Sequence, residues 1–409
     1  MEINTSKYKK IILLLLLLIQ ITIVFIPSKV LADDEDEEEN SLNEAEIEQT
    51  LVESSAQIAE EPKLNARAAI IYDRTTKKTI WGKNENEKRA MASTTKIMTA
   101  IVVLENSNLN DIVTISKKAA GTGGSRLKVN EGDKITVESL LYGLMLRSGN
   151  DAAVALAEYV GGTIECFASL MNEKAEELEL KNTHFVTPHG LDNEEHYTTA
   201  YELALLTDYA LNNETFAKIV NTKSITININ GNVRSIYNTN ELLGCIQGVD
   251  GVKTGFTNNA GRCLVTSCTR NENQIITVVL GCDTKKQRTA DSVKLIEYAF
   301  KNYTRINLEE MIKKEYENWQ QINKNRIYIN KAQEKEIELK IEEIKTKAIP
   351  IKNGEEKNIK VEINAVYSYE APLIRGTKIG NIIVKNKDKV IETIDIICNK
   401  TIEKKNVLT

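Results

Sequence analysis

The sequence predicts an α+β fold, in which an antiparallel sheet covered by helices is followed by a small β-rich C-terminal domain. Strand patterns stand at both ends of residues 66–303, and helical patterns lie between them. From residue 304 onward, short stretches alternate between apolar and polar residues, as half-buried strands do. A chain of 409 residues is also too long for one ordinary core, so two domains are expected.

The N-terminus has the pattern of an export signal. Lysines precede the apolar run 11–26, which leads to the small residue Ala32. Residues 1–32 are therefore expected to be a signal peptide that is cleaved after Ala32. An uncleaved membrane anchor is the alternative, although the run is a little short for a full span.

The next segment, 33–65, is expected to be an acidic disordered segment and linker, with a helix possible around 45–58. Its acidic run 33–39 repels itself. Removal of residues 1–32, which carry four lysines and one glutamate, changes the formal net charge from −5 to −8. No dense basic block is present, so nucleic acid is not an expected partner.

Within residues 66–303, the sequence predicts a sheet and a helical lobe. Strands are expected at 68–72 and 79–81, and again at 262–269 and 274–281, each pair forming a hairpin. Helices are expected at 97–104, 137–146, 151–159, 166–178, 199–212 and 290–303.

Three short motifs indicate serine acyl transfer: Ser93-Thr94-Thr95-Lys96, Ser148-Gly149-Asn150 and Lys253-Thr254-Gly255. Each motif is weak evidence alone. A serine followed three residues later by a lysine is common by chance in a lysine-rich chain, the second motif is typical of turns, and the third suits an exposed strand end. They fall, however, at a helix start, at a turn between helices and on a strand of a hairpin. A lysine three residues after a serine lies on the same helical face and can act as its base.

In this order, the motifs resemble those of penicillin-binding proteins and serine β-lactamases. The surrounding sequence resembles the low-molecular-weight D-alanyl-D-alanine carboxypeptidases, from about residue 66 to 303 and more weakly beyond. The stretches that carry this resemblance are 123–125, 146–152, 187–192, 251–257 and 260–263. It implies a transpeptidase-like fold, peptidoglycan peptides ending in D-Ala-D-Ala as substrates, and β-lactam antibiotics as inhibitors.

The resemblance also implies catalytic roles. Ser93 is expected to attack the carbonyl of the penultimate D-alanine, with Lys96 as its base. Burial and the nearby cation Lys253 are expected to lower the pKa of Lys96. Ser148 is expected to relay a proton to the departing amine, and Asn150 to hold the substrate amide and Lys96.

The opposite wall of the site is expected to be a strand that pairs with the extended substrate. Lys253 and Thr254 would line it, and Gly255 would allow close approach. The backbone N–H groups of Ser93 and Phe256 would form the oxyanion hole.

The terminal carboxylate of the substrate needs a positive partner. Lys253, Thr254 and Arg288 are the candidates, but an exposed arginine at a helix start is an equally good interpretation of Arg288. No metal or organic cofactor is expected. A zinc site formed by His189, Asp192 and His196 is less plausible than an ordered loop.

Six cysteines occur in a chain that is expected to be exported, yet their spacing forms no disulfide framework. Cys263 and Cys268 are five residues apart on one predicted strand and should point to opposite faces. Buried free thiols are therefore expected.

Residues 304–400 are expected to form the β-rich domain, with strands at 337–341, 359–363, 382–384 and 391–398, and with Pro372, Gly376 and Gly380 at turns. The tail 401–409 has only three apolar residues, too few for stable membrane binding. Membrane contact is thus expected only through an uncleaved N-terminus.

The sequence argues against two other functions. A class A β-lactamase needs an additional glutamate that activates water, and the loop sequence that would carry it is absent. Residues 189–192 stand in that region instead. A penicillin sensor or wall-binding protein without activity would not need the intact serine and lysine.

Overall fold

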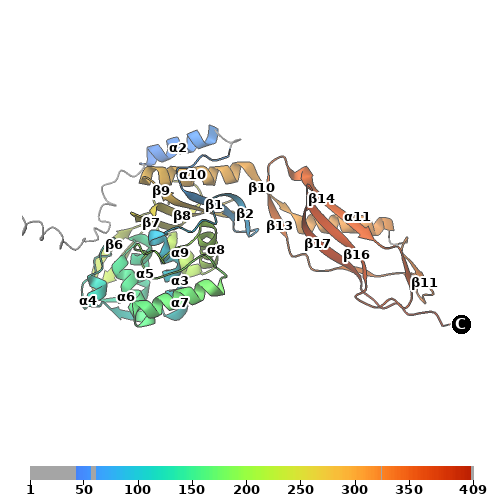
Figure 1. Ribbon diagram of the computed structural model, residues 1–409, viewed down its shortest axis with the longest axis horizontal. Coiled ribbons are helices and arrows are strands. Elements are labelled where there is room, and N and C mark those ends of the chain that lie inside the picture. Colours follow the sequence, from blue (N-terminus) through green and yellow to red (C-terminus); the bar gives the residue numbers. More distant parts are fainter. Residues whose placement is uncertain (1–42, 57–60, 324, 407–409) are drawn as a thin grey trace, which may run out of the picture.

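The computed structural model describes residues 43–56, 61–323 and 325–406. The predicted signal segment and the acidic run 33–39 lie outside these residues. In the described part, a layered domain of helices and one sheet is followed by a second, mostly β-stranded domain that extends away from it (Figure 1).

An antiparallel five-stranded sheet forms the middle layer of the first domain. Its strand order is β2-β1-β9-β8-β7, so strands from both ends of the domain meet in one sheet, as predicted. The strands are β1 (Ala68–Asp73), β2 (Lys78–Lys83), β7 (Val249–Thr257), β8 (Gly261–Arg270) and β9 (Asn273–Cys282). β7 stands at one edge of this sheet.

The two faces of the sheet pack against different helices, because successive residues of a strand point in opposite directions. In β1, Ile70 and Tyr72 join the large core shared with the helical lobe, whereas Ala69 and Ile71 join the core beneath α10. Cys263 and Cys268 are likewise buried in these two different cores, which confirms that they point to opposite faces. None of the six cysteines, all of which lie in the part of the chain that the structure describes, forms a disulfide, and four of them are buried.

The helical lobe covers one face of the sheet (Figure 1). Its main elements are η2 (Ala92–Thr95), α3 (Lys96–Asn106), α5 (Val137–Leu146), α6 (Asn150–Gly161), α7 (Ile164–Glu177), α8 (Ala200–Ala210) and α9 (Glu214–Val220). The helices expected from the sequence are present with small boundary shifts. Smaller elements complete the lobe: α4 (Lys117–Ala120) and the pairs β3 (Ile112–Thr114) with β4 (Lys134–Thr136) and β5 (Ser224–Ile229) with β6 (Asn232–Tyr237).

The other face is covered by α10 (Lys285–Asn302), with α2 (Glu44–Ala56) lying against it (Figure 1). Ile47 of α2 is 1% exposed and belongs to the core of this layer, and Glu46 forms an ion pair with Lys286. The helix expected around 45–58 is thus confirmed. This stretch is a packed helix, however, which differs from the expectation of a disordered linker.

The second domain is built on a four-stranded antiparallel sheet with the order β12-β17-β16-β14. Its strands are β12 (Leu339–Ile341), β14 (Ile359–Ala365), β16 (Lys378–Asn386) and β17 (Lys389–Cys398). The domain also contains two separate strand pairs: β10 (Tyr303–Asn307) with β13 (Ala348–Lys352), and β11 (Tyr328–Asn330) with β15 (Ser368–Glu370). A short 3-10 helix, η3 (Glu356–Asn358), precedes β14. The four predicted strands are present.

Two features of this domain were not predicted correctly. A 16-residue helix, α11 (Leu308–Asn323), packs on the sheet where only strands were expected. Gly380 lies within β16, at a register shift, and not at a turn.

No single helix among the described residues is long and apolar enough to cross a membrane. Helices α6 and α7 meet the length and composition criteria only as a pair, with a bend of 84° between them.

Candidate active site

Ser93 and Lys96 are brought together where η2 runs directly into α3. The Lys96 side chain is fully buried, and its Nζ lies 2.7 Å from Ser93 Oγ. The sequence predicted this proximity from an α-helical spacing. In the structure, Ser93 lies on a 3-10 turn, in which residues three apart stand almost directly above one another.

Lys96 Nζ has two further hydrogen-bond partners, Asn150 Oδ1 at 2.8 Å and the backbone carbonyl of His189 at 2.9 Å. All three of these partners are uncharged. Carbonyl oxygens only accept hydrogen bonds, whereas a hydroxyl can donate or accept. A neutral Lys96 amine could therefore donate its two hydrogens to Asn150 and His189 and direct its lone pair at the Ser93 hydroxyl.

The turn between α5 and α6 carries the second motif, as predicted. Ser148 lines the cleft and has φ +57°, which is uncommon for a residue with a side chain. Asn150 begins α6, and its Nδ2 donates to the carbonyl of Gly123 at 2.8 Å while its Oδ1 accepts from Lys96. The Asn150 amide is thus fixed at both ends.

Strand β7 forms the opposite wall and carries the third motif. A Cβ at Gly255 would lie 3.0 Å from the backbone nitrogen of Ser93, so the strand approaches η2 closely only because this residue is glycine. Thr254 Oγ1 is 2.7 Å from Thr239 Oγ1. Lys253 is 1% exposed, and its Nζ donates to the Thr254 carbonyl at 2.8 Å.

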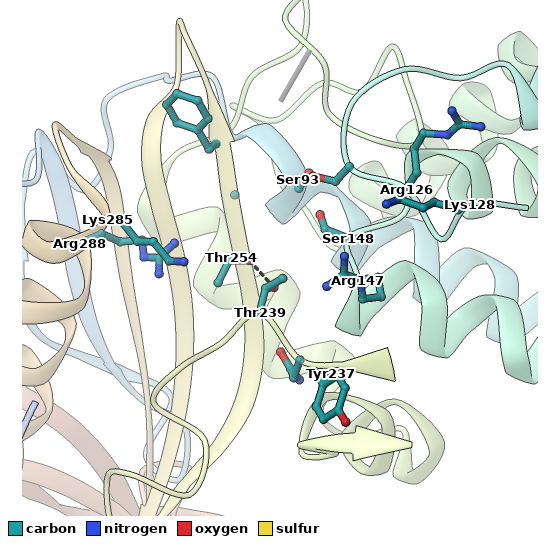
Figure 2. Close-up of a pocket in the computed structure, with 14 residues that line it drawn as sticks. Ser93, Arg126, Lys128, Arg147, Ser148, Tyr237, Thr239, Thr254, Lys285 and Arg288 are labelled. Carbon is teal, nitrogen blue, oxygen red and sulfur yellow. Dashed lines mark hydrogen bonds between the residues drawn. The ribbon is translucent and has the colours of Figure 1, made fainter. Parts of the chain in front are cut away.

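Between the two walls lies a cleft of about 740 Å³ (Figure 2). Phe256 lines it and stacks against the guanidinium of Arg262, whose centre is 3.5 Å from the ring centroid. The cleft is lined by five basic residues: Arg126, Lys128, Arg147, Lys285 and Arg288. No acidic residue lines it in the part of the chain that the structure describes. Such a site favours anionic ligands.

Arg288 lies at the cleft in the first turns of α10, which begins at Lys285, five residues before the predicted start. It is 3% exposed and pairs with Glu241 at 2.5 Å, so the interpretation of Arg288 as an exposed residue is wrong. Burial alone would raise the pKa of Glu241, but the Arg288 charge holds that pKa below its ordinary value. Arg288 as a carboxylate partner stays a prediction.

The loop 187–192 supports the site from behind η2. Gly190 has φ +88°, and a Cβ there would lie 1.9 Å from the Ala92 carbonyl oxygen. Asp192 accepts hydrogen bonds from Thr257 Oγ1 at 2.5 Å and from the backbone of Asn259 at 3.2 Å. The loop is therefore an ordered structural element, and no cluster of metal-ligating side chains occurs among the described residues.

His189 of this loop is partly buried, the nearby His196 is buried, and both are uncharged at neutral pH. His196 Nε2 lies 2.7 Å from Thr95 Oγ1, and its Nδ1 accepts from the backbone of Val186 at 2.9 Å. Burial lowers the pKa of His196 to about 4. Burial, together with the charge of Lys96, lowers the pKa of His189 to about 3.

Comparison with known families identifies both domains. A family model described as D-alanyl-D-alanine carboxypeptidase matches residues 55–284, more than half of the chain. The chain belongs to this family. A second model, described as penicillin-binding protein 5, C-terminal domain, matches residues 310–404.

The sequence matches between this carboxypeptidase-family chain and its relatives extend over more than half of its length. The carboxypeptidase DacF of Bacillus subtilis is 35% identical over 84% of the chain and 87% of that relative. DacD of Escherichia coli is 36% identical over 60% of the chain and 66% of its own length. Crystal structures of Francisella tularensis DacD and Haemophilus influenzae penicillin-binding protein 5 match with TM-scores of 0.69 and 0.68.

The Francisella tularensis structure is 28% identical in sequence, and the match covers 86% of this chain and 98% of that chain. The Haemophilus influenzae structure is 27% identical, and the match covers 85% of this chain and 100% of that chain. The fold of this family member is therefore the transpeptidase-like α+β fold with a β-rich C-terminal domain, as expected from the sequence.

Several residues that line the cleft of this carboxypeptidase-family chain were given no role from the sequence. Tyr237, Asn238 and Thr239 come from the end of β6 and the segment after it, and Lys128 comes from the loop after α4. No local pattern marks them, because their place depends on how distant segments pack.

Proposed function

We propose that this chain is a serine-type D-alanyl-D-alanine carboxypeptidase that works through an acyl-enzyme at Ser93. The observation that carries the mechanism is the buried Lys96 amine, which lies 2.7 Å from Ser93 Oγ and is hydrogen-bonded to Asn150 Oδ1 and the His189 carbonyl. Burial disfavours the charged form of an amine, so a buried lysine is easier to deprotonate than a solvated one. Its substrates are peptidoglycan stem peptides that end in D-Ala-D-Ala, and β-lactams inhibit it by acylating the same serine.

In the acylation step, Ser93 Oγ attacks the carbonyl carbon of the penultimate D-alanine, and Lys96 takes the hydroxyl proton. The backbone N–H groups of Ser93 and Phe256 bind the oxyanion. The amide C–N bond then breaks, and Ser148 relays a proton to the amine of the leaving D-alanine. Water hydrolyses the ester to complete the reaction.

Substrate placement uses the edge of the sheet. The peptide adds as an extended strand along β7, which stands at the edge of the sheet. Asn150 donates to the substrate amide, and the terminal carboxylate binds near Lys253, Thr254 and Arg288. Lys285 and Arg288, the basic residues on the β7 side of the cleft, support this orientation (Figure 2).

The test uses purified protein with diacetyl-L-Lys-D-Ala-D-Ala and with a labelled penicillin. Release of D-alanine together with a long-lived penicillin adduct supports the proposal. Rapid penicillin hydrolysis without D-alanine release would assign the site to a β-lactamase instead.

Since peptidoglycan lies outside the cytoplasmic membrane, the protein acts there. Residues 1–32 are proposed to direct its export, with cleavage after Ala32. N-terminal sequencing of the protein from fractionated cells tests this, because a mature chain should begin at Asp33. A chain that retains residues 11–26 would indicate a membrane anchor.

A further inference from the structure

Lys128 is a cleft residue that the proposed mechanism does not use. It lies in the loop between α4 and β4 and has φ +64°, an uncommon conformation for a residue with a side chain. Its N–H donates to the buried carboxylate of Asp151 at 2.8 Å, and its carbonyl accepts from Arg234 at 3.1 Å. Contacts from α6 and from β6 thus hold the backbone at this point.

The Lys128 ammonium itself has no hydrogen-bond or ion-pair partner among the described residues. Its side chain extends into the cleft, toward Ser93 and Ser148, whereas the guanidinium of Arg126 points away (Figure 2). Arg126 is also engaged elsewhere, since it donates to the Ala120 carbonyl at 2.5 Å. Lys128 is therefore the cation of this loop that is available to a ligand.

Lys128 also lies on the other wall of the cleft from the proposed carboxylate partner. Lys285 and Arg288 stand on the β7 side of the cleft, and Lys128 stands on the helical-lobe side, beyond Ser148 (Figure 2). A peptide whose terminal carboxylate lies near Arg288 and whose scissile carbonyl lies at Ser93 directs its preceding residue away from Arg288. Lys128 is placed to meet that residue.

We propose that Lys128 forms a second anionic subsite, which binds a carboxylate on the residue that precedes D-Ala-D-Ala. This inference rests on the proposed function, because it needs the substrate orientation described above. The subsite selects acidic stem peptides over neutral ones of the same shape. The backbone contacts at this position keep Lys128 at the wall of the cleft before the substrate arrives.

The test compares two peptides that differ in one charge, acetyl-L-Glu-D-Ala-D-Ala and acetyl-L-Gln-D-Ala-D-Ala. We expect the wild-type protein to cleave the Glu peptide with a kcat/KM higher by roughly threefold or more, through a lower KM, because one partly solvated ion pair is worth about that factor. The Lys128→Gln variant is expected to bring the ratio of the two kcat/KM values to about one. Added salt should also reduce the wild-type ratio.

Lys134→Gln is the matched control, because Lys134 is an exposed lysine of the neighbouring β4 that does not line the cleft. It should retain the wild-type ratio. The ratio is measured within one protein, so partial loss of folded variant does not affect it. A wild-type ratio of one, or a raised ratio that survives Lys128→Gln, overturns the subsite. Failure to release D-alanine from either peptide overturns the proposed function and the subsite together.

Discussion

At the scale of single residues, the proposed chemistry depends on what surrounds Lys96. The side chain is buried and forms hydrogen bonds with Ser93, Asn150 and the His189 carbonyl. The sequence predicted the first two contacts from the motifs. It did not predict the third, because a backbone carbonyl 93 residues away leaves no sequence pattern.

Lys96→Arg should be nearly as damaging as Lys96→Ala. Arginine keeps the positive charge but cannot become a neutral base at accessible pH. Both variants are expected to slow acylation by penicillin by about 100-fold or more, the usual contribution of a general base. Intact-mass measurement of the adduct over time checks this. Near-normal acylation in the arginine variant would mean that Lys96 acts only through its charge.

His196 should make the fold less stable in acid. Its pKa is about 4 in the folded chain and ordinarily 6.5, so below pH 6.5 the unfolded chain binds the proton first. The free energy of unfolding should therefore fall as the pH drops from about 6.5 to about 4, by on the order of 3 kcal/mol. Urea unfolding at several pH values measures this free energy for the wild type and for His196→Gln. If the unfolding free energy falls equally with pH in both proteins, His196 is not the cause of the acid sensitivity.

At the scale of elements, the sequence located most strands and helices because their apolar periodicity is regular. It missed α11 even though the signals were present. Leu308, Ile312 and Tyr316 are buried at a spacing of four, and Asn307 caps the helix by accepting from Glu310 N at 3.1 Å. A spacing of four is typical of a helix and not of an alternating strand.

The start of α10 was also placed too late. The first turn, Lys285–Arg288, is polar and lacks the apolar positions that mark the rest of the helix. Its cap, Thr284, accepts a hydrogen bond from Gln287 N. A threonine at this position is a typical helix cap, and it was the sequence signal for the earlier start. Because the helix starts at Lys285, Arg288 lies in its first turn, at the cleft.

Gly190→Ala tests how the loop 187–192 supports η2. The new Cβ would meet the Ala92 carbonyl oxygen at 1.9 Å, and φ is +88°. We expect a loss of stability of more than about 2 kcal/mol and slower acylation, because η2 carries Ser93. Gly132→Ala is the control, since it has φ +82° but no atom within 4 Å, and should cost only about 1 kcal/mol. Equal thermal and acylation effects in both variants would show that the contact with η2 is unimportant.

Ile47→Ala tests the packing of α2 on α10. Ile47 is 1% exposed, so the variant should lose about 2 kcal/mol or more of unfolding free energy while its acylation rate is unchanged. Val52→Ala, at a position on the same helix that is 69% exposed, should be nearly neutral. Matching stabilities for the two variants, measured by urea unfolding, would mean that α2 does not contribute to the folded domain.

At the scale of the whole molecule, the site exists because the layered domain brings three distant segments to one cleft. Residues 93–96 come from the helical lobe, 148–150 from the turn between two of its helices, and 253–255 from the sheet edge. The motifs could be recognised from the sequence because each is local. The distances between the motifs across the cleft depend on tertiary packing, and so does the basic lining of the cleft. Neither feature leaves a local pattern in the sequence.

The proposed function requires Ser93 to be the acylated nucleophile of a D-alanyl-D-alanine carboxypeptidase. The most direct measurement is intact-mass analysis of wild type and Ser93→Ala after incubation with penicillin, with D-alanine release assayed in parallel. Wild type should gain the mass of one penicillin and release D-alanine from diacetyl-L-Lys-D-Ala-D-Ala, and Ser93→Ala should remain folded and do neither. A penicillin adduct on folded Ser93→Ala would show that Ser93 is not the nucleophile.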